Sequence, residues 1–115
     1  MIVRDIVSAV EGAVEVEGDL AQEVTGCYVS DLLSDVLANS AHGDLWVTHH
    51  THPNVVAVAA VKGLAGVVMV GGKPLDPEAI ERARVEKVNV IVSPLSAFEA
   101  AGSLFGVLKG ARKES

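Results

Sequence analysis

With 115 residues, 50% of them hydrophobic and only 3% aromatic, the chain suits a single domain over residues 1–115 whose core consists mainly of Val, Ala, Leu and Ile. The formal net charge of −6 and the lack of a basic stripe argue against nucleic acid as a partner, and the longest apolar run, Val67–Val70, is far shorter than the ~20 residues of a membrane span. A single cysteine cannot form an internal disulfide, and the start of the chain does not resemble a leader, so we expect a cytoplasmic protein.

Hydrophobic spacing in the first half of the chain predicts two helices and three strands. Apolar residues three or four apart indicate a short helix that ends near Gly12, and Val14 and Val16 then alternate with glutamates in a half-exposed strand. Ser30 is placed to cap a helix that runs from Asp31 to Asn39. One stripe of that helix is apolar and is formed by Leu32, Leu33, Val36 and Leu37. The strands are expected at 14–16, 24–29 and 45–48.

The second half predicts three further helices and two buried strands. Pro53 fits the first turn of an almost wholly apolar helix, Asn54–Val61, and Asp76–Pro77 starts a helix that continues to Glu86. Ser93–Pro94 is expected to open the last helix. The face of that helix directed at the core is formed by Ala97, Ala101, Leu104 and Leu108. The strands are expected at 66–70 and 88–92.

A strand followed by a helix therefore occurs four times with short connections. Parallel strands need such crossovers, and the favoured right-handed crossovers place helices on both faces of the sheet. The sequence thus predicts an α/β domain, a three-layer α/β/α sandwich with a mainly parallel sheet of about five strands.

Ligands of such sheets usually bind beyond the carboxyl ends of the strands, next to helix N-termini whose N–H groups suit an anion. Here Ser30 and Asp31, the segment Thr48–Asn54, and Ser93 follow predicted strands. The alternative is that Ser30, Ser93 and Asp76 are only helix caps. The Gly71–Lys73 stretch lacks the spacing of a phosphate loop and predicts an ordinary turn.

The segment His49–His52 contains three histidines. In an extended segment His50 and His52 share one side, so they could bind zinc or nickel if Cys27 or Asp31 supplied a third ligand. The alternative role of His52, which Pro53 holds extended, is a hydrogen bond that fixes the loop.

Cys27 and Trp46 both lie within strand patterns. Cys27 is expected to be a buried, inert thiol, and a Cys–His nucleophile would require His49 or His50 within hydrogen-bond distance of it. Trp46 projects to the side opposite Leu45 and is either a core residue or a dimer contact. No buried pair of acids indicates acid–base catalysis.

Three segments, Val24–Asn39, Gly43–Thr48 and Thr51–Ala59, carry a family resemblance. From about Asp5 to Lys109 the chain resembles the DRTGG domain family, as a stand-alone member. The resemblance implies a small α/β fold similar to the N-terminal domain of bacterial HPr kinase, a homodimer, and a regulatory or nucleotide-sensing role without catalysis.

The chain departs from the family pattern at two places. Ala21–Gln22 stands where similar members tend to carry an Asp-Arg pair, and Cys27 stands where a second Gly is usual. An arginine that anchors an anionic ligand in relatives would therefore be missing here, at Gln22.

Three functions compete. The first is a non-catalytic, homodimeric module that senses a small anionic ligand such as an adenine nucleotide, with no cofactor or metal. The second is an interaction or accessory factor of iron hydrogenase or other redox systems, because similar stand-alone proteins tend to be encoded near iron hydrogenases. The third is a small metal-dependent hydrolase that uses the histidines at 49–52. The ligand-binding residues expected for the first are Thr25, Gly26, Ser30, Asp31, Thr48, His50, His52, Asn54 and Ser93.

Overall fold

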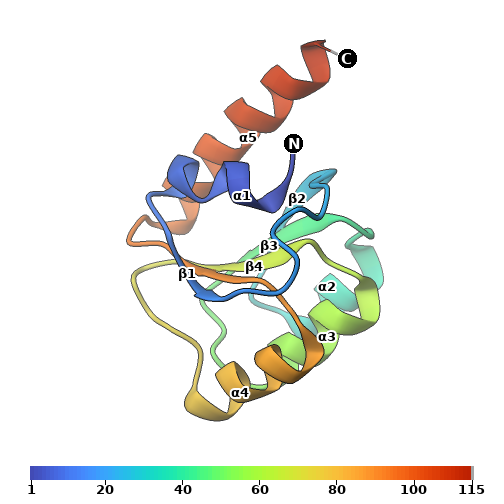
Figure 1. Ribbon diagram of the computed structural model, residues 1–115, viewed down its shortest axis with the longest axis vertical. Helices are drawn as coiled ribbons and strands as arrows, with labels where there is room; N and C mark the ends of the chain where they lie inside the picture. Colours follow the sequence, from blue (N-terminus) through green and yellow to red (C-terminus); the bar gives the residue numbers. More distant parts are fainter. Residues whose placement is uncertain (115) are drawn as a thin grey trace.

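The computed structural model of the protein describes residues 1–114, with side chains placed up to residue 110. The chain forms a central sheet with helices on both faces (Figure 1). The strands are β1 (Ala13–Val16), β2 (Gly26–Val29), β3 (Asp44–Thr48), β4 (Gly66–Met69) and β5 (Val90–Val92). The helices are α1 (Val3–Ile6), the 3₁₀ turn η1 (Ser8–Val10), α2 (Leu33–Asn39), α3 (Asn54–Lys62), α4 (Pro77–Glu86) and α5 (Ala97–Glu114).

The sheet has five strands in the order β1-β5-β4-β3-β2. Strands β2, β3, β4 and β5 are parallel, and β1 is antiparallel to β5. This confirms the three-layer α/β/α sandwich with a mainly parallel sheet. Because β2 is the last strand in the order, only β3 pairs with it, and its outer edge has no strand partner among residues 1–114.

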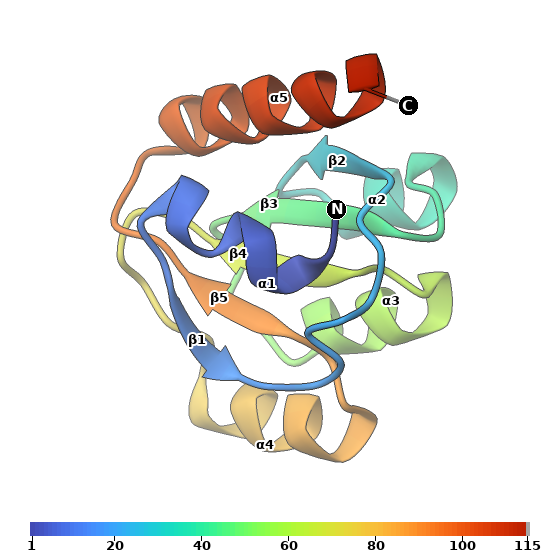
Figure 2. The same ribbon diagram turned by 45° about the horizontal axis from the view of Figure 1, so that its top comes forward.

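Successive side chains of each strand point to opposite faces of the sheet and pack into two separate hydrophobic cores. Trp46, Val67 and Met69 point to the face covered by α2, α3 and α4, whereas Leu45 and Val68 point to the face covered by α1, η1 and α5. Figure 2 shows α5 along one side of the sheet and α3 and α4 on the other. Trp46 is fully buried, so of the two roles expected for it the core role is correct.

Every predicted strand and helix has an observed counterpart, but several bounds differ. Strands β2 and β5 begin two residues later than predicted, and the first helix is divided into α1 and η1. The differences near residues 30–37 and 93–97 bear on the site. Helix α2 begins at Leu33 rather than Asp31, and Leu32 and Leu37 are 63% and 48% exposed, so only half of the predicted apolar stripe is in the core. Helix α5 begins at Ala97 rather than at Ser93. Its core-facing side is formed by Ala100, Leu104 and Leu108, as the apolar spacing predicted within one residue.

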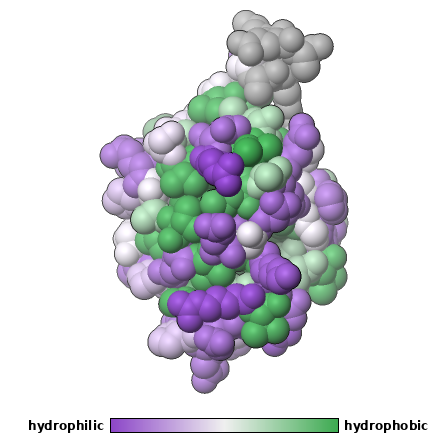
Figure 3. Space-filling model, viewed as in Figure 1, coloured by the Kyte–Doolittle hydropathy of each residue, from purple (hydrophilic) through white to green (hydrophobic). Residues whose placement is uncertain are grey.

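Helix α5 contains three glycines four residues apart, Gly102, Gly106 and Gly110, and a Cβ built on any of them would meet nothing within 4 Å. A glycine inside a helix costs about 1 kcal/mol relative to alanine, and no neighbour among the described residues requires it here. On the face shown in Figure 3, hydrophobic residues extend from the body of the domain up to α5. Within residues 1–114 no helix combines the length and the apolar character needed to cross a membrane.

Candidate functional site

At the carboxyl edge of the sheet, the side chain of Asp31 joins the segments that follow β2 and β3. Its Oδ1 accepts hydrogen bonds from Thr48 Oγ1 and from the backbone N–H of His49, both at 2.7 Å, and its Oδ2 lies 3.2 Å from His49 Nδ1. Asp31 therefore does not serve the start of α2, as its position in the sequence suggested. Its hydrogen bonds to Thr48 and His49 instead join the ends of β2 and β3, and we call this set of contacts the latch.

The hydrogen bonds also set the charge of this carboxylate. Partial desolvation raises the pKa of Asp31, but the bonds from the His49 N–H, the Thr48 hydroxyl and the His49 ring together outweigh it, so the pKa lies below its usual value. The side chains of Asp31 and His49 are 58% and 49% exposed, so this ion pair is largely solvated. The edge carries a negative charge that remains to quite acidic pH.

The ring of His52 accepts a hydrogen bond at the start of helix α3, whose N-cap residue is Pro53. The Nδ1 atom accepts a 3.0 Å hydrogen bond from the backbone N–H of Asn54, two residues on, and the His52 carbonyl accepts from Val55 N at 2.9 Å. Because Nδ1 is the acceptor, the proton of the neutral ring is on Nε2, which becomes a donor. His52 is exposed, and its ring meets that of His50 edge to face at 6.4 Å.

Two further residues predicted to contact a ligand, Thr48 and Ser30, make hydrogen bonds within the chain instead. Thr48 is 1% exposed, and its hydroxyl donates to Asp31 and accepts from His50 N at 3.1 Å. Ser30 Oγ accepts from Leu32 N at 3.1 Å, and its carbonyl accepts from Trp46 Nε1 at 2.7 Å. Ser30 shapes the turn before α2 but is not the N-cap residue, which is Leu32.

Ser93 also differs from both roles expected for it. It is fully buried, its hydroxyl donates to the Val10 carbonyl at 2.6 Å, and it accepts from Leu95 N at 3.1 Å. The cap of α5 is Ser96, whose Oγ accepts from the Glu99 N–H at 3.2 Å while the Glu99 carboxylate accepts from Ser96 N. The Asp76 side chain makes no capping hydrogen bond either, although α4 begins at Pro77 as predicted.

Thr25 and Gly26 lie at the opposite end of β2 from Ser30. Thr25 N donates to the Gly43 carbonyl and Thr25 Oγ1 to the His42 carbonyl, at 3.0 and 3.1 Å. Thr25 is five steps of an extended strand before Ser30, a distance of roughly 15 Å. The two ends of β2 are therefore separate places on the surface, and the structure divides the predicted set into two groups. The residues that do share the carboxyl edge are Ser30, Asp31, Thr48, His50, His52 and Asn54.

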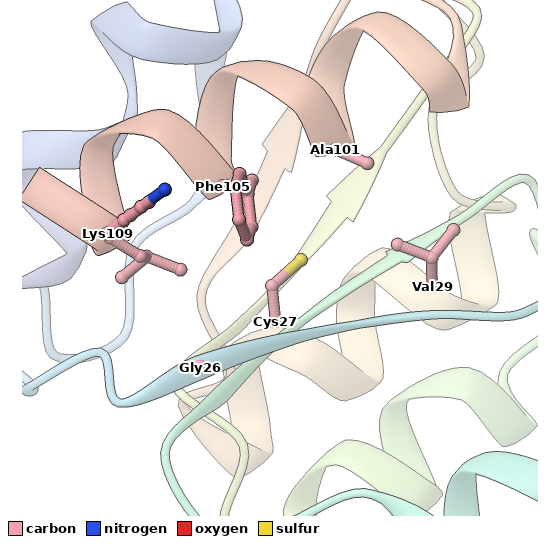
Figure 4. A pocket seen from close by; sticks show the side chains of 7 residues that line it. Gly26, Cys27, Val29, Ala101, Phe105 and Lys109 are labelled. Atoms are coloured by element: carbon pink, nitrogen blue, oxygen red, sulfur yellow. The ribbon is translucent and has the colours of Figure 1, made fainter.

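A groove of about 540 Å³ lies between β2 and α5, on the other side of the sheet from α2 (Figure 4). In Figure 4 the ring of Phe105 projects from α5 towards Cys27, whose sulfur points back towards the helix. Val29, from the end of β2, is 49% exposed. The described residues of the lining are Gly26, Cys27, Val29, Ala101, Phe105, Leu108 and Lys109, of which Lys109 carries the positive charge.

Sequence reasoning missed this groove. The available signal was the pair of phenylalanines, Phe98 and Phe105, which are seven residues apart and therefore lie on one face of the helix, away from the core-facing Leu104. What the sequence did not contain is that α5 crosses the sheet to pack beside β2 and β3.

The arrangement offers little for covalent chemistry. Burial first, and the Asp44 carboxylate second, raise the pKa of the Cys27 thiol to about 11, and no histidine is hydrogen-bonded to it. The Thr48 hydroxyl is buried and donates to Asp31. Among the side chains that the structure describes, residues 1–110, no three of His, Cys, Asp or Glu are grouped as ligands of a metal ion. What the carboxyl edge offers is hydrogen bonding through exposed imidazole, amide and carboxylate groups.

Comparisons with known proteins support the fold. No protein-family model matches the sequence, and no curated protein matches it significantly. A solved structure does match: that of the CBS and DRTGG domains of the regulatory region of Clostridium perfringens pyrophosphatase, complexed with its activator diadenosine tetraphosphate. The TM-score is 0.72 at 15% sequence identity, over 90% of this chain and 45% of that one. The chain thus spans less than half of that regulatory region, and its fold is similar to a DRTGG-containing regulatory structure.

Proposed function

We propose that the protein is a non-catalytic, homodimeric regulatory module of the DRTGG family that senses a small anionic ligand, with an adenine nucleotide as the first candidate. The observation that carries the proposal is the fixed ring of His52. Its Nδ1 is held by Asn54 N, so an exposed N–H donor is already oriented at the carboxyl edge, beside His50. The similarity to a regulatory region that binds diadenosine tetraphosphate supports this class of ligand.

The ligand is proposed to contact His52, His50, Asn54 and Ser30, with Asp31 and Thr48 holding the loops in place. Asp31 is anionic and the whole chain has a net charge of −6, both of which oppose an anion. The N–H groups of Asn54, Val55 and Val56 at the start of α3 already have acceptors within the chain. We therefore expect modest affinity, with a donated hydrogen bond rather than charge as the main contact.

A matched pair of variants at His52 separates its two roles. An asparagine side chain accepts the N–H two residues on in the same way as the His52 ring, so His52→Asn keeps the hydrogen bond from Asn54 N and removes the Nε2 donor, whereas His52→Ala removes both. We expect both variants to lose nucleotide-induced shifts of backbone amide signals around Ser30 and His52. Only His52→Ala should also lower the melting temperature.

The titration uses AMP, ADP, ATP and inorganic phosphate on the wild-type protein. Shifts confined to residues 71–76 or to the C-terminal residues would show that the site is elsewhere, and hydrolysis of a nucleotide that disappears in the His52 variants would overturn the non-catalytic role. A melting temperature raised only by divalent metals would favour the metal-dependent hydrolase. The accessory role in iron hydrogenase or redox systems remains a prediction, and no response to any ligand would favour it.

A further inference from the structure

Helix α5 has one side that nothing in the described chain covers. Phe98 and Phe105 on this side are 87% and 66% exposed, and they are the only phenylalanines of the protein. Beside them runs the apolar groove to β2, whose outer edge has no strand partner within residues 1–114. Large aromatic side chains that are exposed in this way mark a contact surface.

The same side of the helix carries glycines, which have no side chain, next to the projecting phenylalanine rings. Gly102 and Gly106 have open space where a side chain would be, and Phe105 stands between them along the helix axis. Helix positions four and seven apart share a side, so the rings and the glycines form one continuous face. We call this the α5 face and define it as Phe98, Glu99, Gly102, Phe105, Gly106 and Lys109.

We propose that the α5 face binds the α5 face of a second copy of the chain, with the two helices antiparallel about a two-fold axis at the level of residue 104. In this register Glu99 is opposite the partner's Lys109, because both lie five residues from the axis. Gly102 is opposite the partner's Gly106. Phe98 is likewise opposite the glycine at residue 110 of the partner subunit.

Charge and shape both favour this occupant over an unrelated partner. An isologous contact needs a surface that complements itself, and the α5 face carries an acid at one end and a base at the other, and rings beside glycines. The antiparallel arrangement also brings the positive end of each helix dipole to the negative end of the other. Glycines let the two backbones approach closely enough for the rings to pack against them.

The exposed rings account for a large part of the area that a stable pair needs. A fully buried phenylalanine covers about 150–250 Å², so the four rings of two copies supply much of the ~1,000 Å² that a specific interface needs. The groove beside Phe105 and the exposed Val29 on the edge strand extend the contact towards β2. This inference rests on the homodimer of the proposed function and names its surface.

Light scattering on the full chain at about 100 μM tests the surface. We expect a mass near twice 11.9 kDa for the wild type and a monomer for Phe105→Lys. The matched control is Val61→Lys on α3, which changes a side chain that is 77% exposed on the other face of the sheet and should leave the dimer intact. A dimer broken by Val61→Lys but not by Phe105→Lys would overturn the α5 face and keep the homodimer.

A wild-type monomer would overturn this inference and the homodimer, while nucleotide binding at the carboxyl edge would still be decided by its own titration. A monomer whose groove takes up an anionic amphiphile next to Lys109 would identify the groove as a small-molecule site instead.

Disulfide cross-linking tests the register. In a Cys27→Ser background, a mixture of Gly102→Cys and Gly106→Cys chains should form cross-linked pairs on oxidation, because these positions face each other. Either chain alone should form few, because two copies of one position are then about 6 Å apart along the axis in addition to the separation of the helices. Equal cross-linking of one variant with itself would overturn the proposed register.

Discussion

At the carboxyl edge of the sheet, polar groups are satisfied by one another, whereas along α5 apolar groups are left in contact with solvent. Asp31 accepts from Thr48 and His49, and His52 accepts from Asn54, so most donors and acceptors of the edge have partners inside the chain. Phe98 and Phe105 have no comparable cover within the described chain.

The difference indicates where binding free energy is available. A ligand at the carboxyl edge gains only the hydrogen bonds that the loops have not already made, and each contributes on the order of 1 kcal/mol. Covering the α5 face removes apolar area from water, at about 25 cal/mol per Å². We therefore expect the larger stabilisation from association through α5 and a weaker, more selective contribution from a ligand at the edge.

The largest effect is expected in the reactivity of Cys27. Because burial and the Asp44 carboxylate raise the pKa of its thiol to about 11, the thiolate is rare at pH 8, and alkylation by iodoacetamide should be about two orders of magnitude slower than for an ordinary thiol. The rate is measured by mass spectrometry, with the urea-unfolded chain as the control.

The concentration dependence of this rate links it to the α5 face. If two copies cover the groove, alkylation should slow further as the protein concentration rises, and this dependence should vanish in Phe105→Lys. An alkylation rate in the folded protein equal to that in urea would mean that the groove leaves Cys27 open to solvent. The proposed difference between an apolar α5 side and a polar carboxyl edge would then be wrong.

The next largest effect is expected for the latch. Asp31→Ala leaves the buried Thr48 hydroxyl and the His49 N–H without their acceptor, which should lower the free energy of unfolding by about 1–3 kcal/mol in urea titrations. Asp31→Asn keeps an acceptor of the same shape and should cost less. Glu17→Gln, an exposed change just after β1 and outside any helix, is the control and should have almost no effect.

The pH dependence of the latch has a definite sign. Because the pKa of Asp31 is lowered in the folded protein, its stabilisation is present above the pKa of the unfolded chain, about 3.9, and is lost as the pH falls through the lower folded value. Asp31→Asn should therefore flatten the loss of stability below about pH 4. If wild type and Asp31→Asn lost the same free energy of unfolding below about pH 4, the latch would contribute no net stabilisation.

The fold was largely predictable because its signals are local. Val-rich runs of strand length alternate with helical spacing, so each strand and each crossover could be placed along the chain. The errors lie where a tertiary contact overrides the local signal. Thr48 and His49 hold Asp31 at the strand ends, so α2 begins two residues later than its pattern suggested, and the buried bond from Ser93 to Val10 keeps residues 93–96 out of α5.

The candidate site was only partly predictable. The rule that loops gather at the carboxyl ends of parallel strands correctly brought Ser30, Thr48 and His52 to one edge. Which of these side chains already have hydrogen-bond partners within the chain depends on strand register and on distances of a few tenths of an ångström. The spacing of residues along the sequence does not encode either. Thr25 was misplaced because it precedes the strand that Ser30 follows.

The smallest expected effect gives the sharpest contrast, because it has opposite signs in two measurements. Replacing Gly102 and Gly106 by alanine adds methyl groups into open space and removes two glycines from a helix interior, so the double variant should be more stable to urea by about 1–2 kcal/mol at concentrations where the chain is monomeric. The same methyl groups separate the two helix backbones in the proposed pair, so association should weaken. Ser103→Ala changes the same turn of α5 off the α5 face and should raise stability slightly without affecting the dimer. If the glycine variant were both more stable and equally dimeric, then the glycines would have no role in a contact, and α5 would be an ordinary covering helix whose exposed rings need another explanation.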